Sequence, residues 1–112
     1  VNYAALPDDK YIDVCKKITN GHASGIISFG IKGGRDAGAK FIDALQMILR
    51  VLSMGDAKSL ACHPASTLHR QLTPEQKKKA GVSEDLIRIS VGIEHIDDII
   101  QDVEQAIEAS KK

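Results

Sequence analysis

The chain has no tryptophan, and aromatic residues make up only 4% of its 112 residues. Any hydrophobic core must therefore be built largely from aliphatic side chains. Neither charge is in excess, because 15 lysines and arginines balance 15 aspartates and glutamates. That balance gives no argument for a nucleic acid or an anionic membrane as a partner. No apolar run approaches the roughly 20 residues of a membrane-spanning helix, so we expect no membrane partner.

Cysteine is also scarce. Cys15 and Cys62 lie in apolar surroundings without CxxC spacing, which predicts buried free thiols in a reducing compartment. The first residues contain no basic-then-apolar signal segment, so we expect a cytoplasmic protein. The sequence opens on Val1 rather than methionine, which fits a chain that begins inside a longer gene product, and processing is the alternative.

Length and composition predict one folded domain over residues 1–112. Apolar periodicity and turn residues predict helices over 8–20, 36–52, 74–80 and 95–110, and strands over 25–31, 58–62 and 86–94. Each long helix has one apolar stripe and each strand one apolar face. The fold class expected is α+β, a two-layer sandwich in which a small, mostly antiparallel sheet carries helices on one face. Small residues on the other face would leave it free for a ligand or another domain.

The strand over 86–94 is the most informative segment. Its alternating apolar residues, which we expect on one face, are Ile87, Ile89, Val91 and Ile93. Arg88 then points out of the opposite face, beside Ser90 and Gly92. A planar guanidinium among small residues can bind a carboxylate through two hydrogen bonds, although an ordinary solvated arginine is the alternative. We take Arg88 as a candidate binding residue.

Three other features have simpler explanations. The glycine-rich link over 30–35 could cradle a phosphate, but it matches no known phosphate-binding pattern and a tight turn is favoured. His63 and His69, next to Cys62, lack a second ligand pair at zinc-site spacing, so we predict no metal. Ser53 with Gly55 is typical of a helix stop.

The chain shows no complete set of catalytic groups. No Ser/His/Asp or Cys/His arrangement for a nucleophile stands out. His95 is expected on the surface, in the first turn of the last helix. The lysines of the 77–79 cluster are expected on an exposed helix, and none has an apolar setting that would suit Schiff-base chemistry. The sequence therefore predicts the substrate-anchoring part of a larger enzyme.

Three segments resemble one known family. Residues 53–69 resemble its S-L-G-x-x-x-S-L-x-x-H-P-A-x-x-T-H segment, residues 28–34 its S-F-x-x-K-G-G strand, and residues 88–94 its R-[IL]-S-x-G-[IL]-E strand. The family is the pyridoxal-phosphate enzymes of cysteine and methionine metabolism, which includes cystathionine γ-synthase, methionine γ-lyase and O-acetylhomoserine sulfhydrylase. The resemblance covers essentially the whole chain, although Leu68 departs from the usual Thr.

The resemblance implies the C-terminal domain of a fold-type-I enzyme, in which Arg88 and Ser53 bind the α-carboxylate of the substrate. Segments 1–3, 33–38 and 56–59 look most like O-acetylhomoserine sulfhydrylase. That subgroup implies γ-replacement in methionine biosynthesis, in which sulfide displaces acetate from O-acetyl-L-homoserine and gives homocysteine. The alternatives are the same domain of a methionine γ-lyase or a cystathionine γ-synthase, and a non-catalytic isolated domain.

The resemblance also implies what lies outside this chain. The cofactor is pyridoxal 5'-phosphate, and in this family the large domain supplies its Schiff-base lysine and the residues that hold its phosphate and pyridine nitrogen. We therefore expect no catalytic and no cofactor-binding residue here, and an isolated chain without activity. The expected partners are the cofactor-binding large domain of the same enzyme, a small amino-acid substrate, and further copies in a homo-oligomer.

Overall fold

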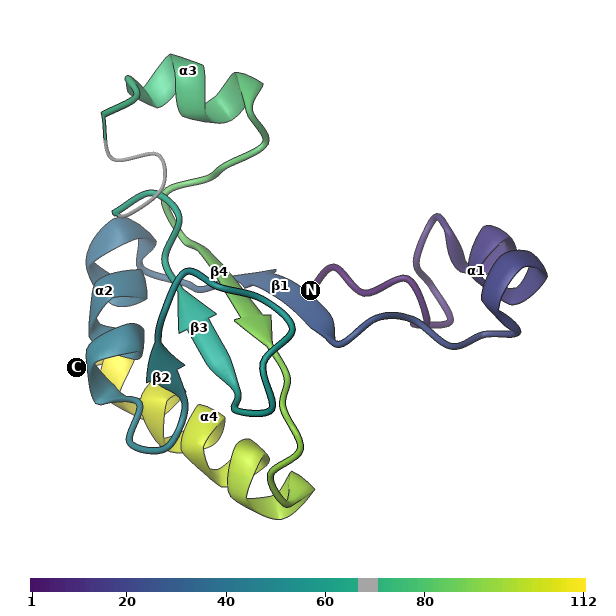
Figure 1. Cartoon of the computed structure of the whole chain (residues 1–112). Coiled ribbons are helices and arrows are strands. Elements are labelled where there is room, and N and C mark those ends of the chain that lie inside the picture. Colours follow the sequence, from purple (N-terminus) through teal and green to yellow (C-terminus); the bar gives the residue numbers. More distant parts are fainter. Residues whose placement is uncertain (67–70) are drawn as a thin grey trace.

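A four-stranded sheet organises the computed structural model, which describes residues 1–66 and 71–112 (Figure 1). Its strands are β1 (Ile26–Gly30), β2 (Leu49–Arg50), β3 (Leu60–Cys62) and β4 (Leu86–Ser90). The helices are α1 (Ile12–Thr19), α2 (Gly34–Ala44), α3 (Pro74–Lys79) and α4 (Ile96–Ser110). The strand order is β1-β4-β3-β2. β4 pairs with β1 and β3 antiparallel, and β2 pairs with β3 parallel, so the predicted mostly antiparallel sheet is confirmed.

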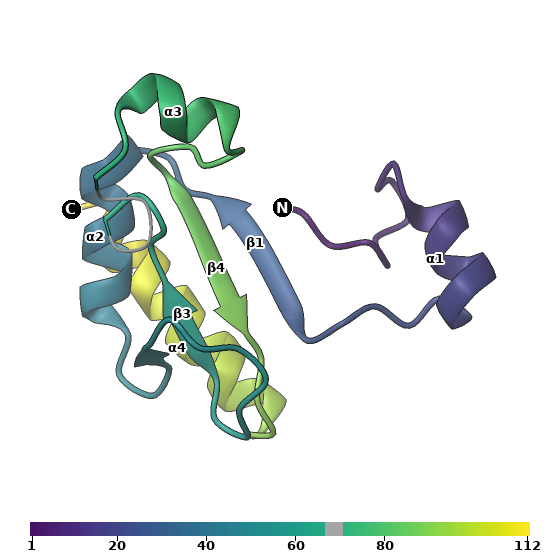
Figure 2. The same cartoon turned by 45° about the horizontal axis from the view of Figure 1, so that its top comes forward.

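One face of this sheet carries α2 and α4, which lie side by side against it (Figures 1 and 2). Ile87 and Ile89 of β4 point into the space between the sheet and the helices, as predicted, and are buried. Phe29 of β1 meets Phe41 of α2 edge to face, with ring centroids 5.6 Å apart. The rest of the core is aliphatic, so the predicted two-layer arrangement with helices on one face is confirmed. None of the described helices is long and apolar enough to cross a membrane.

The N-terminal arm and α1 lie apart from this two-layer unit (Figures 1 and 2). Asn2 pairs with Ser28 at the free edge of β1, through backbone bonds of 2.7 and 3.4 Å. The helix begins at Ile12 and not at the predicted residue 8, since the chain first makes a series of turns. Of the predicted stripe only Cys15 is buried, while Ile18 is 74% exposed.

The helix predicted over 36–52 is wrong in its second half. α2 ends at Ala44, and the residues after it turn into the short strand β2 beside β3. The cause is a tertiary contact, because the carboxylate of Asp102 in α4 accepts hydrogen bonds from the backbone N–H groups of Gln46, Met47 and Ile48. Asp102 itself is buried.

The strand predicted over 86–94 is also too long. β4 ends at Ser90, and the following residues leave the core, so that Ile93 is 86% exposed. Gly92 lies at a close approach here, since a Cβ at that position would overlap the carbonyl oxygen of Ala57. The backbone of residues 91–94 therefore runs close beside the segment before β3.

Candidate substrate-binding site

Arg88 lies in the interior strand β4, on the face of the sheet opposite α2 and α4. In the register of the sheet it stands between Ser28 of β1 and Cys62 of β3. Its side chain is partly exposed, and its Nη2 donates a hydrogen bond to the carbonyl oxygen of Leu52 at 2.8 Å. A guanidinium has five N–H donors, more than this contact requires, so Arg88 is oriented and still able to bind an anion.

The face around Arg88 is not fully open, which corrects the expectation from its small residues. The segment over 52–58, between β2 and β3, lies across part of it. The backbone N–H of Gly55 donates to Ser90 Oγ at 3.1 Å, and the N–H of Ile93 donates to the carbonyl of Ala57 at 2.9 Å. The chain's own loop therefore forms one side of the candidate site, and Ser90 is an anchor for that loop.

Ser53 lies within this loop and is exposed. It directly follows Leu52, whose carbonyl holds Arg88. The prediction that Ser53 marks a helix stop is wrong, because α2 has already ended at Ala44. The structure thus brings the segment that carries Ser53 next to the strand that carries Arg88. The contact between them joins Leu52 and Arg88, which are 36 positions apart in the sequence.

Cys62 lies beside Arg88 on the same side of the sheet. Burial raises the pKa of the Cys62 thiol, and the positive charge of Arg88 and a hydrogen bond from it only partly oppose that rise. The thiol therefore stays neutral near pH 7 and leaves the positive charge of Arg88 available. Both Cys15 and Cys62 are buried free thiols, as predicted.

Glu94 is the member of this region to which the sequence analysis gave no role. Its two carboxylate oxygens accept from the backbone N–H and the hydroxyl of Ser59, at 2.7 and 2.8 Å. The bond from the Ser59 N–H is the main reason that the pKa of Glu94 lies below its ordinary value. Ser59 and Glu94 are both fixed positions of the family patterns, which is the sequence signal that could have pointed to them. They lie 35 positions apart, and no sequence pattern predicts that they are in contact.

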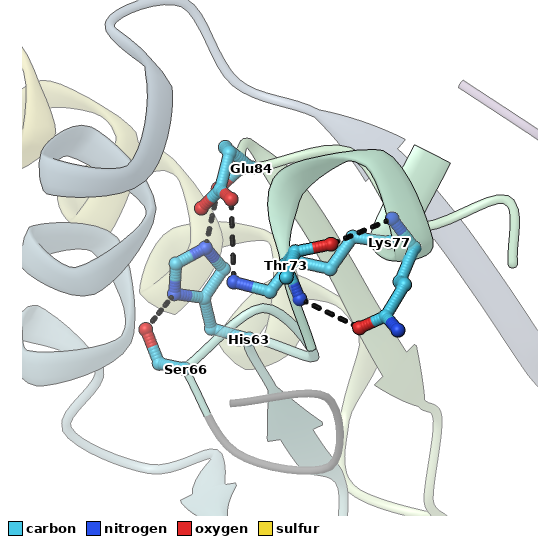
Figure 3. A network of polar contacts seen from close by, with 6 residues as sticks. His63, Ser66, Thr73, Lys77 and Glu84 are labelled. Atoms are coloured by element: carbon cyan, nitrogen blue, oxygen red, sulfur yellow. Dashed lines mark hydrogen bonds and ion pairs between the residues drawn. The ribbon is translucent and has the colours of Figure 1, made fainter. Parts of the chain in front are cut away.

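His63, the candidate metal ligand, belongs to a different polar network (Figure 3). Its Nε2 lies 2.6 Å from the carbonyl oxygen of Glu84, and its Nδ1 lies 2.8 Å from Ser66 Oγ. Both ring nitrogens are therefore engaged with protein atoms. No group of three metal-ligating side chains occurs within residues 1–66 and 71–112, while His69 and Leu68 lie outside the described residues.

The glycine-rich link over 30–35 forms a turn into α2. Gly33 and Gly34 adopt positive φ angles of 108° and 70°, which favour glycine and explain the pair without a phosphate. His95 caps the N-terminus of α4, where its Nδ1 accepts from the Asp97 N–H at 3.2 Å, and it is exposed as expected.

A covalent cofactor site of this family needs a Schiff-base lysine, and the buried lysine of the described residues does not suit that role. Lys77 is the buried lysine of the described residues, which corrects its expected place on an exposed surface. Its ammonium group lies 3.2 Å from Glu84 Oε1 (Figure 3). A paired ammonium in this position anchors α3 and is not a free nucleophile.

The fold and the site define a two-layer α+β unit that presents an arginine from an interior strand beside a loop of its own chain. The chain belongs to the Cys/Met metabolism PLP-dependent enzymes, a family that it matches over residues 1–108. It is 41% identical over 107 residues to O-acetyl-L-homoserine sulfhydrylase 1 of Thermus thermophilus, covering 96% of this chain and 25% of that protein. It is 54% identical over 86 residues to L-methionine gamma-lyase of Pseudomonas putida, covering 77% of this chain and 22% of that protein.

Solved structures of enzymes from this family have the same fold over the matched part. An O-acetylhomoserine (thiol)-lyase of Campylobacter jejuni, with a pyridoxyl group on a lysine, superimposes with a TM-score of 0.87 at 42% identity, over 96% of this chain and 25% of that one. Yeast cystathionine gamma-lyase gives 0.92 at 37% identity, over 99% and 28%. The structure is therefore that of the C-terminal part of a fold-type-I enzyme. The chain spans about a quarter of these relatives, and the cofactor lysine lies outside the matched part.

Proposed function

We propose that this chain is the part of a pyridoxal-phosphate-dependent O-acetyl-L-homoserine sulfhydrylase that anchors the α-carboxylate of the amino-acid substrate, in the cytoplasm. The observation that carries the proposal is the placement of Arg88. It is held by the Leu52 carbonyl at 2.8 Å, on the sheet face opposite the helices and next to the segment that contains Ser53. A cofactor-binding part, outside this chain, completes the enzyme in this proposal, and several copies assemble.

Arg88 would bind the carboxylate through two parallel N–H donors, and the Ser53 hydroxyl would add a third. The contact fixes one end of the substrate, so that the bonds that react at Cα and Cγ are held in one orientation. When bound in the assembled enzyme, the cofactor supplies an electron sink for the γ-replacement. Acetate leaves the substrate and sulfide adds in its place, which gives homocysteine.

A second candidate function is γ-elimination, as in a methionine γ-lyase. It has support from the 54% identity to the Pseudomonas putida enzyme, which exceeds the 41% identity to the Thermus thermophilus sulfhydrylase, although over fewer residues. In either enzyme Arg88 would have the same role, because both substrates are α-amino acids. The two candidates differ in whether sulfide is incorporated.

The test is to produce this chain together with the cofactor-binding part and to assay homocysteine from O-acetyl-L-homoserine and sulfide. Arg88→Ala should raise KM for the amino acid and lower kcat/KM by at least about tenfold, the order expected for losing a desolvated charge pair. KM for sulfide should change little, since sulfide has no carboxylate. An unchanged kcat/KM for the amino acid would rule out the anchoring role. Thiol release from L-methionine without sulfide would favour the second candidate.

A further inference from the structure

We propose that Glu94 is a positioning residue. Acting through Ser59, it holds the segment over 52–58 against the end of β4, and so keeps Ser53 beside Arg88. This inference rests on the function proposed above. The hydrogen bonds of the Glu94 carboxylate go to Ser59, so its effect on substrate binding would be indirect.

The first step is the contact between Glu94 and Ser59. Glu94 Oε2 accepts from the Ser59 backbone N–H at 2.7 Å, and Oε1 accepts from the Ser59 hydroxyl at 2.8 Å. Ser59 is fully buried and directly precedes β3. Two short bonds to a carboxylate are charge-assisted and fix both position and direction, so the start of β3 is tied to the segment after β4.

The second step is that Ser59 also binds the backbone next to Glu94. The Ser59 hydroxyl accepts from the backbone N–H of Gly92 at 2.9 Å while donating to Glu94. The N–H of Ile93 also donates to the carbonyl of Ala57 at 2.9 Å. These bonds join residues 57–59 to residues 92–94 and fix the C-terminal end of the 52–58 segment.

The third step is the other end of the same segment. The Gly55 N–H donates to Ser90 Oγ at 3.1 Å, and Leu52 accepts from Arg88 at 2.8 Å. A loop held only at this end could shift along the strand and carry Ser53 with it. The contacts of Glu94 prevent that shift, and because Leu52 is part of the same segment they also help to set the direction of the Arg88 guanidinium.

The close approach of the two backbones explains why the restraint is needed. A Cβ at Gly92 would overlap the Ala57 oxygen and would lie 2.6 Å from the Lys58 carbonyl carbon. The two backbones lie too close together for a side chain at position 92. The polar backbone groups between them therefore need hydrogen-bond partners within the protein. The Glu94 carboxylate accepts from two of the donors there, which a neutral amide with one acceptor oxygen cannot do in the same geometry.

The experiment compares Glu94→Gln with Arg88→Ala in the assembled enzyme that contains this chain and the cofactor-binding part. Glu94→Gln should raise KM for O-acetyl-L-homoserine severalfold, with KM for sulfide unchanged and kcat lowered less than the amino-acid KM is raised. Glu94→Asp keeps the charge and should recover part of the loss. Glu104→Gln is the matched control, since Glu104 is exposed on α4, and it should leave both KM values unchanged.

Ser59→Ala provides an independent variant. It removes the hydroxyl contacts to Glu94 and Gly92 and keeps the backbone bond, so it should give a smaller rise in the same KM. In the chain itself, Glu94→Gln should speed hydrogen exchange at the Ser59 and Gly92 amides, while amides of α4 keep their protection.

The outcomes separate the two proposals. If Arg88→Ala raises the amino-acid KM and Glu94→Gln does not, the positioning role of Glu94 is wrong and the anchoring role stands. If neither variant changes it, the anchoring role itself is wrong. If Glu94→Gln lowers the unfolding temperature and affects the two KM values equally, Glu94 only supports the fold, and the inference is overturned.

Discussion

The carboxylate of Asp102, in the middle of α4, accepts a hydrogen bond of 2.8 Å from the backbone N–H of Ile48, 54 positions earlier in the chain. The N–H groups of Gln46 and Met47 donate to the same carboxylate, at 2.8 and 2.9 Å. Burial raises the pKa of Asp102, but these donors and Gln105 together outweigh it, so the pKa lies below its ordinary value. A buried negative charge is thus stabilised by the backbone turn that it shapes.

Asp102→Asn should destabilise the fold by about 2–4 kcal/mol, because an amide has one acceptor oxygen and would leave buried N–H groups without partners. The residues after α2 should lose protection from hydrogen exchange first, since this carboxylate directs them into β2. Glu104→Gln, an exposed change on the same helix, is the control and should cost less than about 0.5 kcal/mol. Equal free energies of unfolding for the two variants, from urea denaturation, would show that the Asp102 contacts contribute little.

The depressed pKa values of Asp102 and Glu94 predict how stability depends on pH. A carboxyl group whose folded pKa is below its unfolded value binds fewer protons in the folded state. Its contribution to stability is fully present above the unfolded pKa, about 4, and is lost as pH falls through the folded value. The free energy of unfolding should therefore stay nearly constant from pH 7 to about 5 and decline below about 4.

The comparison that tests this pH dependence is the wild-type chain against Asp102→Asn, by denaturant unfolding at a series of pH values. The variant has no carboxyl group at that position, so its stability should decline less between pH 5 and the lowest pH measured. Parallel curves for the two proteins would contradict the contribution assigned to Asp102.

The fold class was predictable because α4, β1 and the first half of the helix predicted over 36–52 each pack one face on the core with the period of their own secondary structure. The end of α2 was not, because apolar residues continue at helical spacing past Ala44 and no local breaker stands there. The residues after α2 turn where they bind Asp102, which lies 54 positions after Ile48. Local sequence periodicity cannot predict a contact over that distance. The extra strand β2 was missed for the same reason, since its pairing with β3 needs the turn that Asp102 holds.

Part of the candidate site was likewise predictable from the sequence, and part of it was not. The face on which Arg88 lies followed from strand alternation with Ile87 and Ile89, and the structure confirms it. The loop that covers part of that face could not be predicted, because its contacts join residues more than 30 positions apart. Ser90 was interpreted as a small residue that leaves space, whereas its hydroxyl holds the loop. The binding roles of Arg88 and Ser53 stay predictions, to be tested by the kinetics described above.

Gly38 in α2 leaves the space that the buried His63 ring occupies. A Cβ at Gly38 would lie 2.8 Å from His63 Nε2 and 3.1 Å from Cδ2. The ring cannot move away freely, since Nε2 and Nδ1 are held by Glu84 and Ser66 (Figure 3). Alanine is favoured over glycine within a helix by about 1 kcal/mol. We nevertheless expect Gly38→Ala to destabilise the chain by about 1–3 kcal/mol, because forced overpacking exceeds that gain.

The double variant Gly38→Ala with His63→Ala separates this clash from other effects. Removing the ring leaves room for the added methyl group, so the two losses of stability should not add, and the double variant should be more stable than their sum predicts. Urea denaturation of the four proteins gives the interaction energy, which should be favourable and at least about 1 kcal/mol. Additive losses would mean that the ring yields to the methyl group without cost, and that Gly38 has no steric role toward His63.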